Sequence, residues 1–300
     1  MTFFDERSAE YAAAFQTLVR CDPDGDRELM ATLTTLFGSR PRSTPCVDWG
    51  AGTGRLTRAL LSRFDTVYAV EPSAPMRERL AANAPGAQIL DGSVPDAVTP
   101  RPCGIAVLSH VLYHVPDHLW GPTVVRLARQ LADDGVLLIA MKHPDTGCNA
   151  MLEAFGAARF DLYRIVATLR HHPELTLEMR AAPGRLATGS LEDTLAVARF
   201  MLFDRTPAGF SRLPSEREFQ RYVREVFWDE TRGRGGWNME QVFALVRRNP
   251  AWSRSYRTPP RRRRVLDDAG GAPGAPLTPH GRGLNVVARA FARVPDVHVE

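Results

Sequence analysis

Short apolar runs alternate with helical patterns along the first 150 residues of the chain. After each run, apolar residues recur every three or four positions, which is the period of an amphipathic helix. This alternation predicts parallel strands joined by crossover helices, and so an α/β sheet with helices on both faces. The predicted strands cover residues 46–49, 66–71, 87–91, 105–108 and 136–141, and the predicted crossover helices cover 56–64, 75–83 and 119–131.

Two segments lie outside this alternation. Helical patterns without strands predict an N-terminal cap or lid over residues 1–40 and a helical substrate-binding insertion over 146–255. Residues 41–145 form the predicted Rossmann-like core. A Gly-, Ala- and Pro-rich run within 256–300 predicts a mobile loop, and the β-like run 283–290 predicts C-terminal strands that complete the core sheet.

The composition is that of an ordinary globular protein, with 44% apolar and 24% charged residues among 300, which excludes a disordered or collagen-like chain. The positive charge is concentrated at the end of the chain. Residues 251–300 hold nine arginines and four acidic residues, whereas the preceding 250 hold 29 basic and 30 acidic residues. A neutral body argues against a groove that follows nucleic acid.

No stretch reaches the roughly 18 apolar residues that a membrane helix needs, and the N-terminus lacks the pattern of a secretory signal. The four cysteines are scattered without a Cys-x-x-Cys pair, so we expect reduced thiols in a cytoplasmic protein. No group of histidines, cysteines and acids has metal-ligand spacing, and no metal is expected.

The most informative segment is residues 47–54, Val-Asp-Trp-Gly-Ala-Gly-Thr-Gly, between a predicted strand and a predicted helix. A glycine-rich turn at the carboxyl edge of a parallel sheet lets a ligand approach the backbone closely. The dinucleotide fingerprint Gly-x-Gly-x-x-Gly would need its third glycine at Arg55, where it is absent. The spacing is instead Asp-x-Gly-x-Gly-x-Gly.

This turn resembles the first motif of the class I S-adenosylmethionine-dependent methyltransferases. Further elements match in order: Glu71 ends the second strand, Asp91 ends the third, residues 111–117 follow the fourth, and residues 134–139 open the fifth. The resemblance covers residues 44–142. It implies a Rossmann-like fold, S-adenosyl-L-methionine as cofactor, S-adenosyl-L-homocysteine as product, and a methyl acceptor as partner.

The resemblance also implies a set of cofactor-binding residues. The cofactor presents an ammonium, a ribose diol and an adenine amine, all donors that suit carboxylate or carbonyl acceptors. Glu71 is expected on the ribose and Asp91 on the adenine amine, unless Asp91 is only a strand-end acid. Asp48 is expected near the ammonium through water or backbone, or as a support of the turn. The full set is Asp48, Gly50, Ala51, Gly52, Gly54, Glu71, Pro72, Asp91, Gly92, Ser93 and Ser109.

Candidate catalytic residues follow the fourth strand, where the methyl group should face the acceptor. His110 is the preferred base or orienting group, supported by Tyr113, while His114 either takes part or organises the loop. If His110 is a general base, turnover should rise with pH near its ordinary pKa of about 6.5. Tyr11 resembles a lid aromatic beside the sulfonium, or is a core residue of its helix. Lys142, after the fifth strand, is expected to be solvated or to cap a helix.

Four functions remain to be compared. A small-molecule methyltransferase acting on an O, N or C nucleophile fits the neutral body and the apolar insertion. An RNA or DNA methyltransferase would use Arg261 to Arg264 on phosphate, although no stacking aromatics are interleaved there. A cyclase, hydroxylase, decarboxylase or binding module could use the same cofactor site. A nicotinamide oxidoreductase is disfavoured by the missing third glycine, and the oligomeric state is left open.

Overall fold

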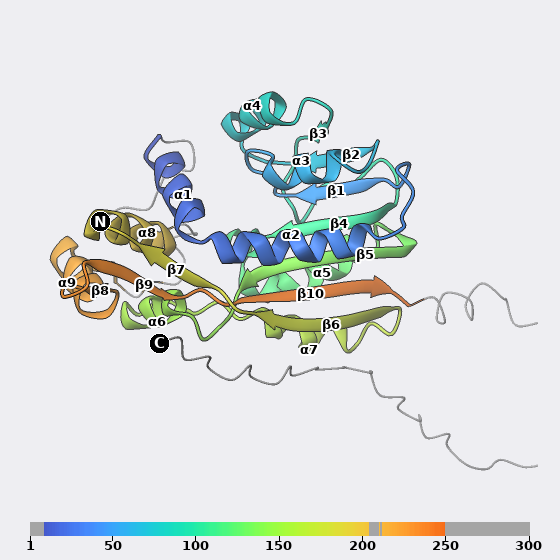
Figure 1. Cartoon of the computed structure of the whole chain (residues 1–300). Coiled ribbons are helices and arrows are strands. Elements are labelled where there is room, and N and C mark those ends of the chain that lie inside the picture. The colour runs from blue at the N-terminus through green and yellow to red at the C-terminus, as the bar shows by residue number, and fades with distance from the viewer. Residues whose placement is uncertain (1–8, 204–209, 211, 250–300) are drawn as a thin grey trace, which may run out of the picture.

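The computed structural model describes residues 9–203, 210 and 212–249. A seven-stranded sheet forms its centre, with strand order β3-β2-β1-β4-β5-β10-β6 (Figure 1). Its first five strands are parallel, as predicted: β1 (Cys46–Trp49), β2 (Val67–Val70), β3 (Gln88–Leu90), β4 (Cys103–Ser109) and β5 (Leu131–Lys142). The mostly parallel α/β fold expected from the alternating pattern is therefore confirmed.

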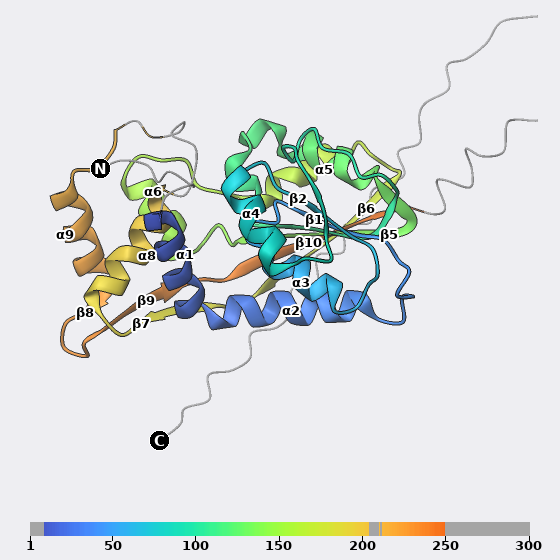
Figure 2. The same cartoon turned by 90° about the horizontal axis from the view of Figure 1, so that it is seen from above.

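Helices cover both faces of the sheet, as Figure 2 shows from above. On β4, Ile105 and Val107 point to one face and pack with α2 (Pro23–Phe37) and α3 (Arg55–Leu61). Ala106 and Leu108 point to the other face and pack with α5 (Trp120–Ala128) and α7 (Ile165–Leu169). Burial on both faces explains why this strand is a continuous apolar run rather than an alternating one.

The segment 146–255 is not the helical insertion that we expected. Two of its segments, β6 (Leu175–Ala182) and β10 (Gln241–Arg248), complete the main sheet, with β10 antiparallel to both β5 and β6. The sequence carried a signal for β6, whose Leu175 and Leu177 are buried while Thr176 and Glu178 are exposed. The C-terminal strands predicted within 256–300 lie outside the described residues, and β10 occupies the place beside β5.

A second group of elements packs at one end of the sheet around its own apolar core (Figures 1 and 2). Helix α1 (Ala9–Cys21) contacts α8 there, with the rings of Phe15 and Phe200 5.9 Å apart. The other members are α6 (Gly147–Ala154), α8 (Leu191–Phe203), α9 (Glu216–Val226) and a three-stranded sheet of β7 (Arg185–Thr188), β9 (Arg234–Asn238) and β8 (Trp228–Asp229).

The remaining regular elements are short or lie beside the site: α4 (Ala74–Asn83) and the 3₁₀ turns η1 (Leu112–His114), η2 (Asp117–Leu119) and η3 (Leu162–Arg164). Among the helices of the described residues, none combines the length and apolar character required to cross a membrane.

Candidate active site

The glycine turn between β1 and α3 is held in a conformation that requires glycine. Gly50 has φ 72° and Gly52 has φ 54°, in the left-handed region that other residues enter only with strain. A Cβ on Gly50 would lie 2.4 Å from a methyl carbon of Val111, so this glycine allows two segments to pack. A Cβ on Gly52 would meet no atom within 4 Å. The backbone at Gly52 therefore borders open space that a ligand can fill.

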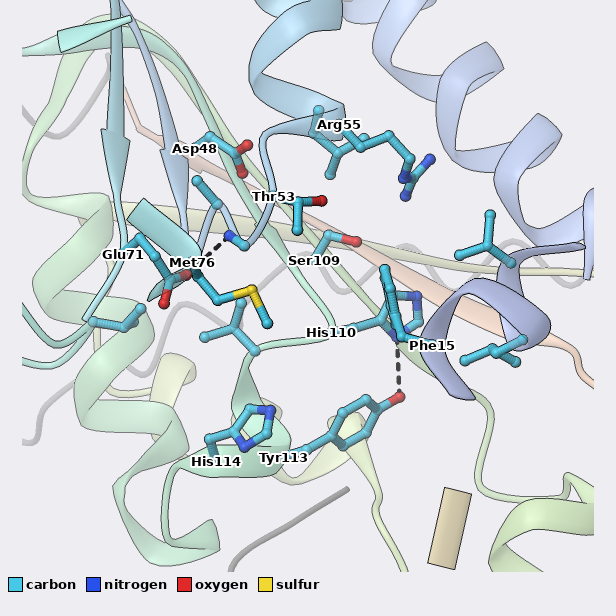
Figure 3. A pocket seen from close by; sticks show the side chains of 18 of the residues that line it. Phe15, Asp48, Thr53, Arg55, Glu71, Met76, Ser109, His110, Tyr113 and His114 are labelled. Carbon is cyan, nitrogen blue, oxygen red and sulfur yellow. Dashed lines mark hydrogen bonds between the residues drawn. The ribbon is translucent and has the colours of Figure 1, made fainter. Parts of the chain in front are cut away.

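Glu71, directly after β2, joins this turn to the next strand. Its Oε2 accepts a hydrogen bond from the Gly52 N–H at 2.9 Å (Figure 3), and its Oε1 accepts one from the Ser73 N–H at 2.9 Å. The side chain is buried yet lines the cavity beside the turn. Each carboxylate oxygen has a second lone pair, so Glu71 can fix the turn and still accept hydrogen bonds from two ligand hydroxyls.

Asp48 stands behind the turn. Its Oδ2 accepts a hydrogen bond from the Thr57 hydroxyl at 2.7 Å, which ties the end of β1 to α3. Burial, with a smaller contribution from the neighbouring Glu71 charge, raises the pKa of the Asp48 carboxyl to about 6. The geometry thus gives Asp48 the turn-supporting role that was one of its two expected roles.

A single cavity of about 730 Å³ runs from this turn to the end of β5. It brings together most of the residues predicted from the sequence: Asp48, Gly50, Ala51, Gly52, Glu71, Pro72, Ser93, Ser109, His110, Tyr113 and His114. Figure 3 shows Asp48, Glu71 and Met76 toward one end and His110 with Phe15 toward the other.

Four predicted residues are not part of the described lining. Asp91 is exposed and its Oδ1 accepts a hydrogen bond from Arg77 Nη1 at 2.8 Å, and its contact with adenine stays a prediction. Gly92 is also absent from the lining. A Cβ on Gly54 would lie 2.7 Å from Cδ1 of Leu80, so this glycine leaves room for the leucine side chain. Tyr11 belongs to α1, but its side chain lies outside the described part of the structure.

Lys142 is neither solvated nor a helix cap, contrary to our expectation. Its Nζ lies 2.5 Å from Oδ2 of Asp22, the N-cap of α2, and both side chains are buried in the cavity wall. Lys142 lies at the carboxyl end of the fifth strand, and this position indicated that it could be a site residue. The sequence around Asp22 contains no pattern that indicates a place in the site. Phe160 and Phe200 also line the cavity, and the lining residues that the sequence analysis missed include Phe15, Gly25, Thr53, Arg55, Met76, Met201 and Gln241.

His110 lies at the end of β4 with a left-handed backbone conformation, and both its backbone and its ring make polar contacts. Its φ is 58°, and its N–H donates to the Ala140 carbonyl at 2.9 Å. Nδ1 lies 3.2 Å from the Tyr113 hydroxyl, which accepts the Lys142 backbone N–H at 2.7 Å. Burial, together with the positive charges of Lys142 and Arg55, lowers the pKa of His110 to about 3. With such a pKa, His110 is not expected to change turnover near pH 6.5.

Comparison with known proteins agrees with this geometry. A family model described as a methyltransferase domain matches residues 22–225, which is more than half of the chain. The chain belongs to the class I S-adenosylmethionine-dependent methyltransferases. S-adenosylmethionine is therefore its cofactor.

Relatives of this methyltransferase include two proteins named uncharacterized methyltransferases. The one from Exiguobacterium sibiricum is 37% identical over 97 residues, and the one from Geobacillus kaustophilus is 34% identical over 96 residues. The matches cover 32% and 31% of this chain and 45% of each relative, so they span about half the length of those proteins.

Solved structures share the fold of this methyltransferase at low sequence identity. The YcgJ protein of Bacillus subtilis is 15% identical with a TM-score of 0.54, covering 74% of this chain and 99% of that one. Protein BH2331 of Bacillus halodurans is 14% identical with a TM-score of 0.53, covering 73% and 97%. These likenesses support the fold alone.

The residues of this methyltransferase fit the cofactor. The space beside Gly52 is free of protein atoms, and the Glu71 carboxylate lies at its edge with acceptor capacity left for the ribose hydroxyls. Met76 and Val94 add apolar walls to the same end of the cavity, and Ser93 adds a hydroxyl. An apolar slot with a few placed polar groups is the usual form of such a site.

Proposed function

We propose that this methyltransferase transfers the methyl group to an O, N or C nucleophile of a small molecule. The observation that carries the proposal is the continuity of the cavity, in which the Gly52–Glu71 edge opens into a chamber walled by Phe15, Phe160 and Phe200. A chamber of aromatic side chains suits a compact apolar molecule. A phosphate backbone would need cations along a surface groove, whereas the four cations of this lining, Arg55, Arg58, Arg79 and Lys142, lie in the wall of the cavity, where Lys142 is paired with Asp22.

The residues divide the task between them. When bound, S-adenosylmethionine supplies a methyl group on a sulfonium, which is already activated for displacement. Glu71 and the turn at Gly52 would hold the ribose of the cofactor, on the side of the cavity that leads to the end of β4. Ser109 and His110 lie at that end, and the aromatic walls exclude water and align the acceptor. Alignment of this kind provides a large rate effect without a covalent catalyst.

We also propose that the protein works in the cytoplasm. All four cysteines, Cys21, Cys46, Cys103 and Cys148, lie in the described part of the chain, where they are buried and form no disulfide. Burial raises the pKa of Cys46 and Cys103, with Cys103 reaching about 12, which keeps both thiols protonated and unreactive. Four reduced thiols suit a reducing compartment.

Calorimetric titration with S-adenosylmethionine, S-adenosylhomocysteine and NAD tests the cofactor side. We expect binding of the first two and none of NAD. A screen of small-molecule acceptors by mass spectrometry then tests the reaction, because each methyl transfer adds one CH₂ unit to the acceptor mass. Methylation of RNA or DNA instead, together with binding that falls steeply with salt, would contradict the proposed substrate class.

A further inference from the structure

Lys142 is the one lysine among the 38 lysine and arginine residues of the chain, and it lies in the wall of the cavity. The other 37 are arginines, and arginine makes surface ion pairs such as Arg42 with Asp65. An ion pair with a purely structural role can be made with arginine in the same way. A lysine at this position supplies a compact ammonium with three N–H donors instead of a planar fork. This difference suits a group that also binds a ligand.

The ammonium of Lys142 has donors to spare. Its Nζ contacts Oδ2 of Asp22 at 2.5 Å, and this is its one hydrogen-bond partner among the described residues. Two of its three N–H groups therefore remain. The side chain is 9% exposed and lines the cavity, so these donors can be satisfied only from the cavity. Asp22 accepts on both of its oxygens, since Oδ1 accepts the Gly25 N–H at 3.2 Å.

Lys142 stands beside the part of the cavity where the methyl acceptor is proposed to lie. Its backbone N–H donates to the Tyr113 hydroxyl at 2.7 Å, and that hydroxyl lies 3.2 Å from Nδ1 of His110 at the end of β4 (Figure 3). The Tyr113 ring packs against Phe160, with centroids 4.5 Å apart, and Phe160 is one of the aromatic walls. A ligand atom bound to Lys142 would therefore have an apolar ring-sized space next to it.

The charges in this part of the cavity favour an anion. Lys142 from β5 is positive, Arg55 from α3 lies in the same lining, and the bound cofactor brings a sulfonium. Asp22 from α2 offsets one positive charge, whereas the other acids of the lining, Asp48 and Glu71, belong to the cofactor end (Figure 3). An anionic oxygen would balance the charge and accept from the spare N–H groups in charge-assisted hydrogen bonds.

His114 is another titratable group of the same cavity. It lies in η1, and Figure 3 shows its ring apart from that of His110. A neutral imidazole can take a proton, whereas the ammonium of Lys142 has no lone pair with which to do so. A ligand that arrives with its oxygen already ionised needs no base, so its binding at Lys142 does not depend on His114.

We propose, on the basis of the small-molecule methyltransferase function above, that Lys142, held in place by Asp22, binds an anionic oxygen of the methyl acceptor. The acceptor class is an apolar, ring-sized molecule that carries a phenolate or a carboxylate. A neutral molecule of the same shape would leave the spare donors of a buried ammonium unpaired, which is costly. Lys142 is thus a specificity residue that selects charged acceptors over neutral ones.

Calorimetric titration of the full chain, saturated with S-adenosylhomocysteine at weakly alkaline pH, tests this selection with matched probes. The anions are p-nitrophenolate and benzoate, and their neutral counterparts are p-nitroanisole and benzamide. We expect at least one anion to bind about tenfold or more tightly than its counterpart. Binding of p-nitrophenolate alone would identify phenolates as the class, and binding of benzoate alone would identify carboxylates. No binding of either anion, or equal affinity within both pairs, would overturn the proposal.

Two variants separate ligand binding from folding. Asp22→Asn combined with Lys142→Met leaves no uncompensated buried charge; it should bind S-adenosylhomocysteine as the wild type does and the preferred anion about tenfold or more weakly. Asp22→Asn alone keeps the ammonium, removes the opposing charge and should tighten anion binding, which a purely structural pair would not do. Arg42→Met, which removes the exposed pair with Asp65, is the control and should leave the anion affinity unchanged.

Two other results would place the anion site elsewhere. If the double variant binds S-adenosylhomocysteine about tenfold more weakly, Lys142 holds the carboxylate of the cofactor and the proposal is wrong. If His114→Asn abolishes anion binding and the double variant retains it, the site belongs to His114. Failure of the proposed function gives a different result: methylation of RNA or DNA would refute the small-molecule acceptor, while the probe affinities would still show whether Lys142 binds an anion.

Discussion

Lys142 and Asp22 form a buried ion pair that joins the carboxyl end of β5 to the N-cap of α2. Nζ of Lys142 lies 2.5 Å from Oδ2 of Asp22, and the two side chains are 9% and 8% exposed. The same Asp22 side chain accepts a hydrogen bond from the Gly25 N–H at 3.2 Å. The pair therefore fixes the first helices of the chain against the wall of the active-site cavity.

Lys142→Met should destabilise the fold by about 3–5 kcal/mol, because it leaves the Asp22 carboxylate buried without its counter-charge. Urea unfolding measures the change. Asp22→Asn combined with Lys142→Met should recover most of the loss, since no uncompensated charge remains. As a control, Arg42→Ala removes the exposed pair with Asp65 and should cost less than about 1 kcal/mol. Equal losses in the single and double variants would contradict this account.

Glu71→Gln should weaken S-adenosylhomocysteine binding by about tenfold to a hundredfold, the effect of losing hydrogen bonds to a charged group worth about 1.5–3 kcal/mol. The matched change Asp91→Asn should alter the affinity less than about twofold, because Asp91 is exposed and bound to Arg77. Calorimetric titration compares the two variants. Equal weakening would restore the adenine contact predicted for Asp91 from the sequence.

Two alanine substitutions in the glycine turn should act on different properties: Gly50→Ala mainly on stability and Gly52→Ala mainly on cofactor binding. Gly50→Ala places a Cβ against Val111 and should lower the free energy of unfolding by about 1–3 kcal/mol from overpacking, with backbone strain in addition. Gly52→Ala meets no protein atom, so it should cost only the strain of about 1 kcal/mol. Its methyl group enters the ligand space, however, and S-adenosylhomocysteine affinity should fall about tenfold or more. Thermal unfolding measures the loss of stability in each variant, and calorimetric titration measures the loss of affinity. Unchanged S-adenosylhomocysteine affinity in Gly52→Ala would show that the cofactor binds elsewhere.

Asp48 should make the fold less stable as pH rises. Its folded pKa of about 6 lies above the ordinary value of 3.8 for an aspartate, so the folded state binds the proton more tightly. The stabilisation is fully present below pH 3.8 and is lost as pH rises through about 6, amounting to about 3 kcal/mol. Asp48→Asn, which can still accept from Thr57, should remove this dependence and be more stable than wild type at neutral pH. Parallel curves of unfolding free energy against pH for the two proteins would refute the raised pKa.

Local sequence patterns were sufficient to predict the parallel strands β1 to β5. The strand at residues 46–49 has the predicted bounds, because an apolar run followed by a glycine turn and an amphipathic helix is encoded within a few residues. The meeting of Gly52 with Glu71 also follows from sequence. Their strands are adjacent and parallel, so their carboxyl ends share one edge of the sheet.

Only the tertiary structure showed the antiparallel part of the sheet, in which β10 pairs with β5 and β6. Strand β10 lies beside β5 although about 100 residues separate them, and no local pattern states which strand fills that place. The same pairing places Gln241 opposite Lys142, and α2 brings Asp22 to Lys142. Periodicity shows that a segment is apolar on one face, but the partner of that face is chosen by packing over the whole chain. For this reason the cofactor edge was predictable from residues near one another, whereas the polar contacts around His110 required the fold.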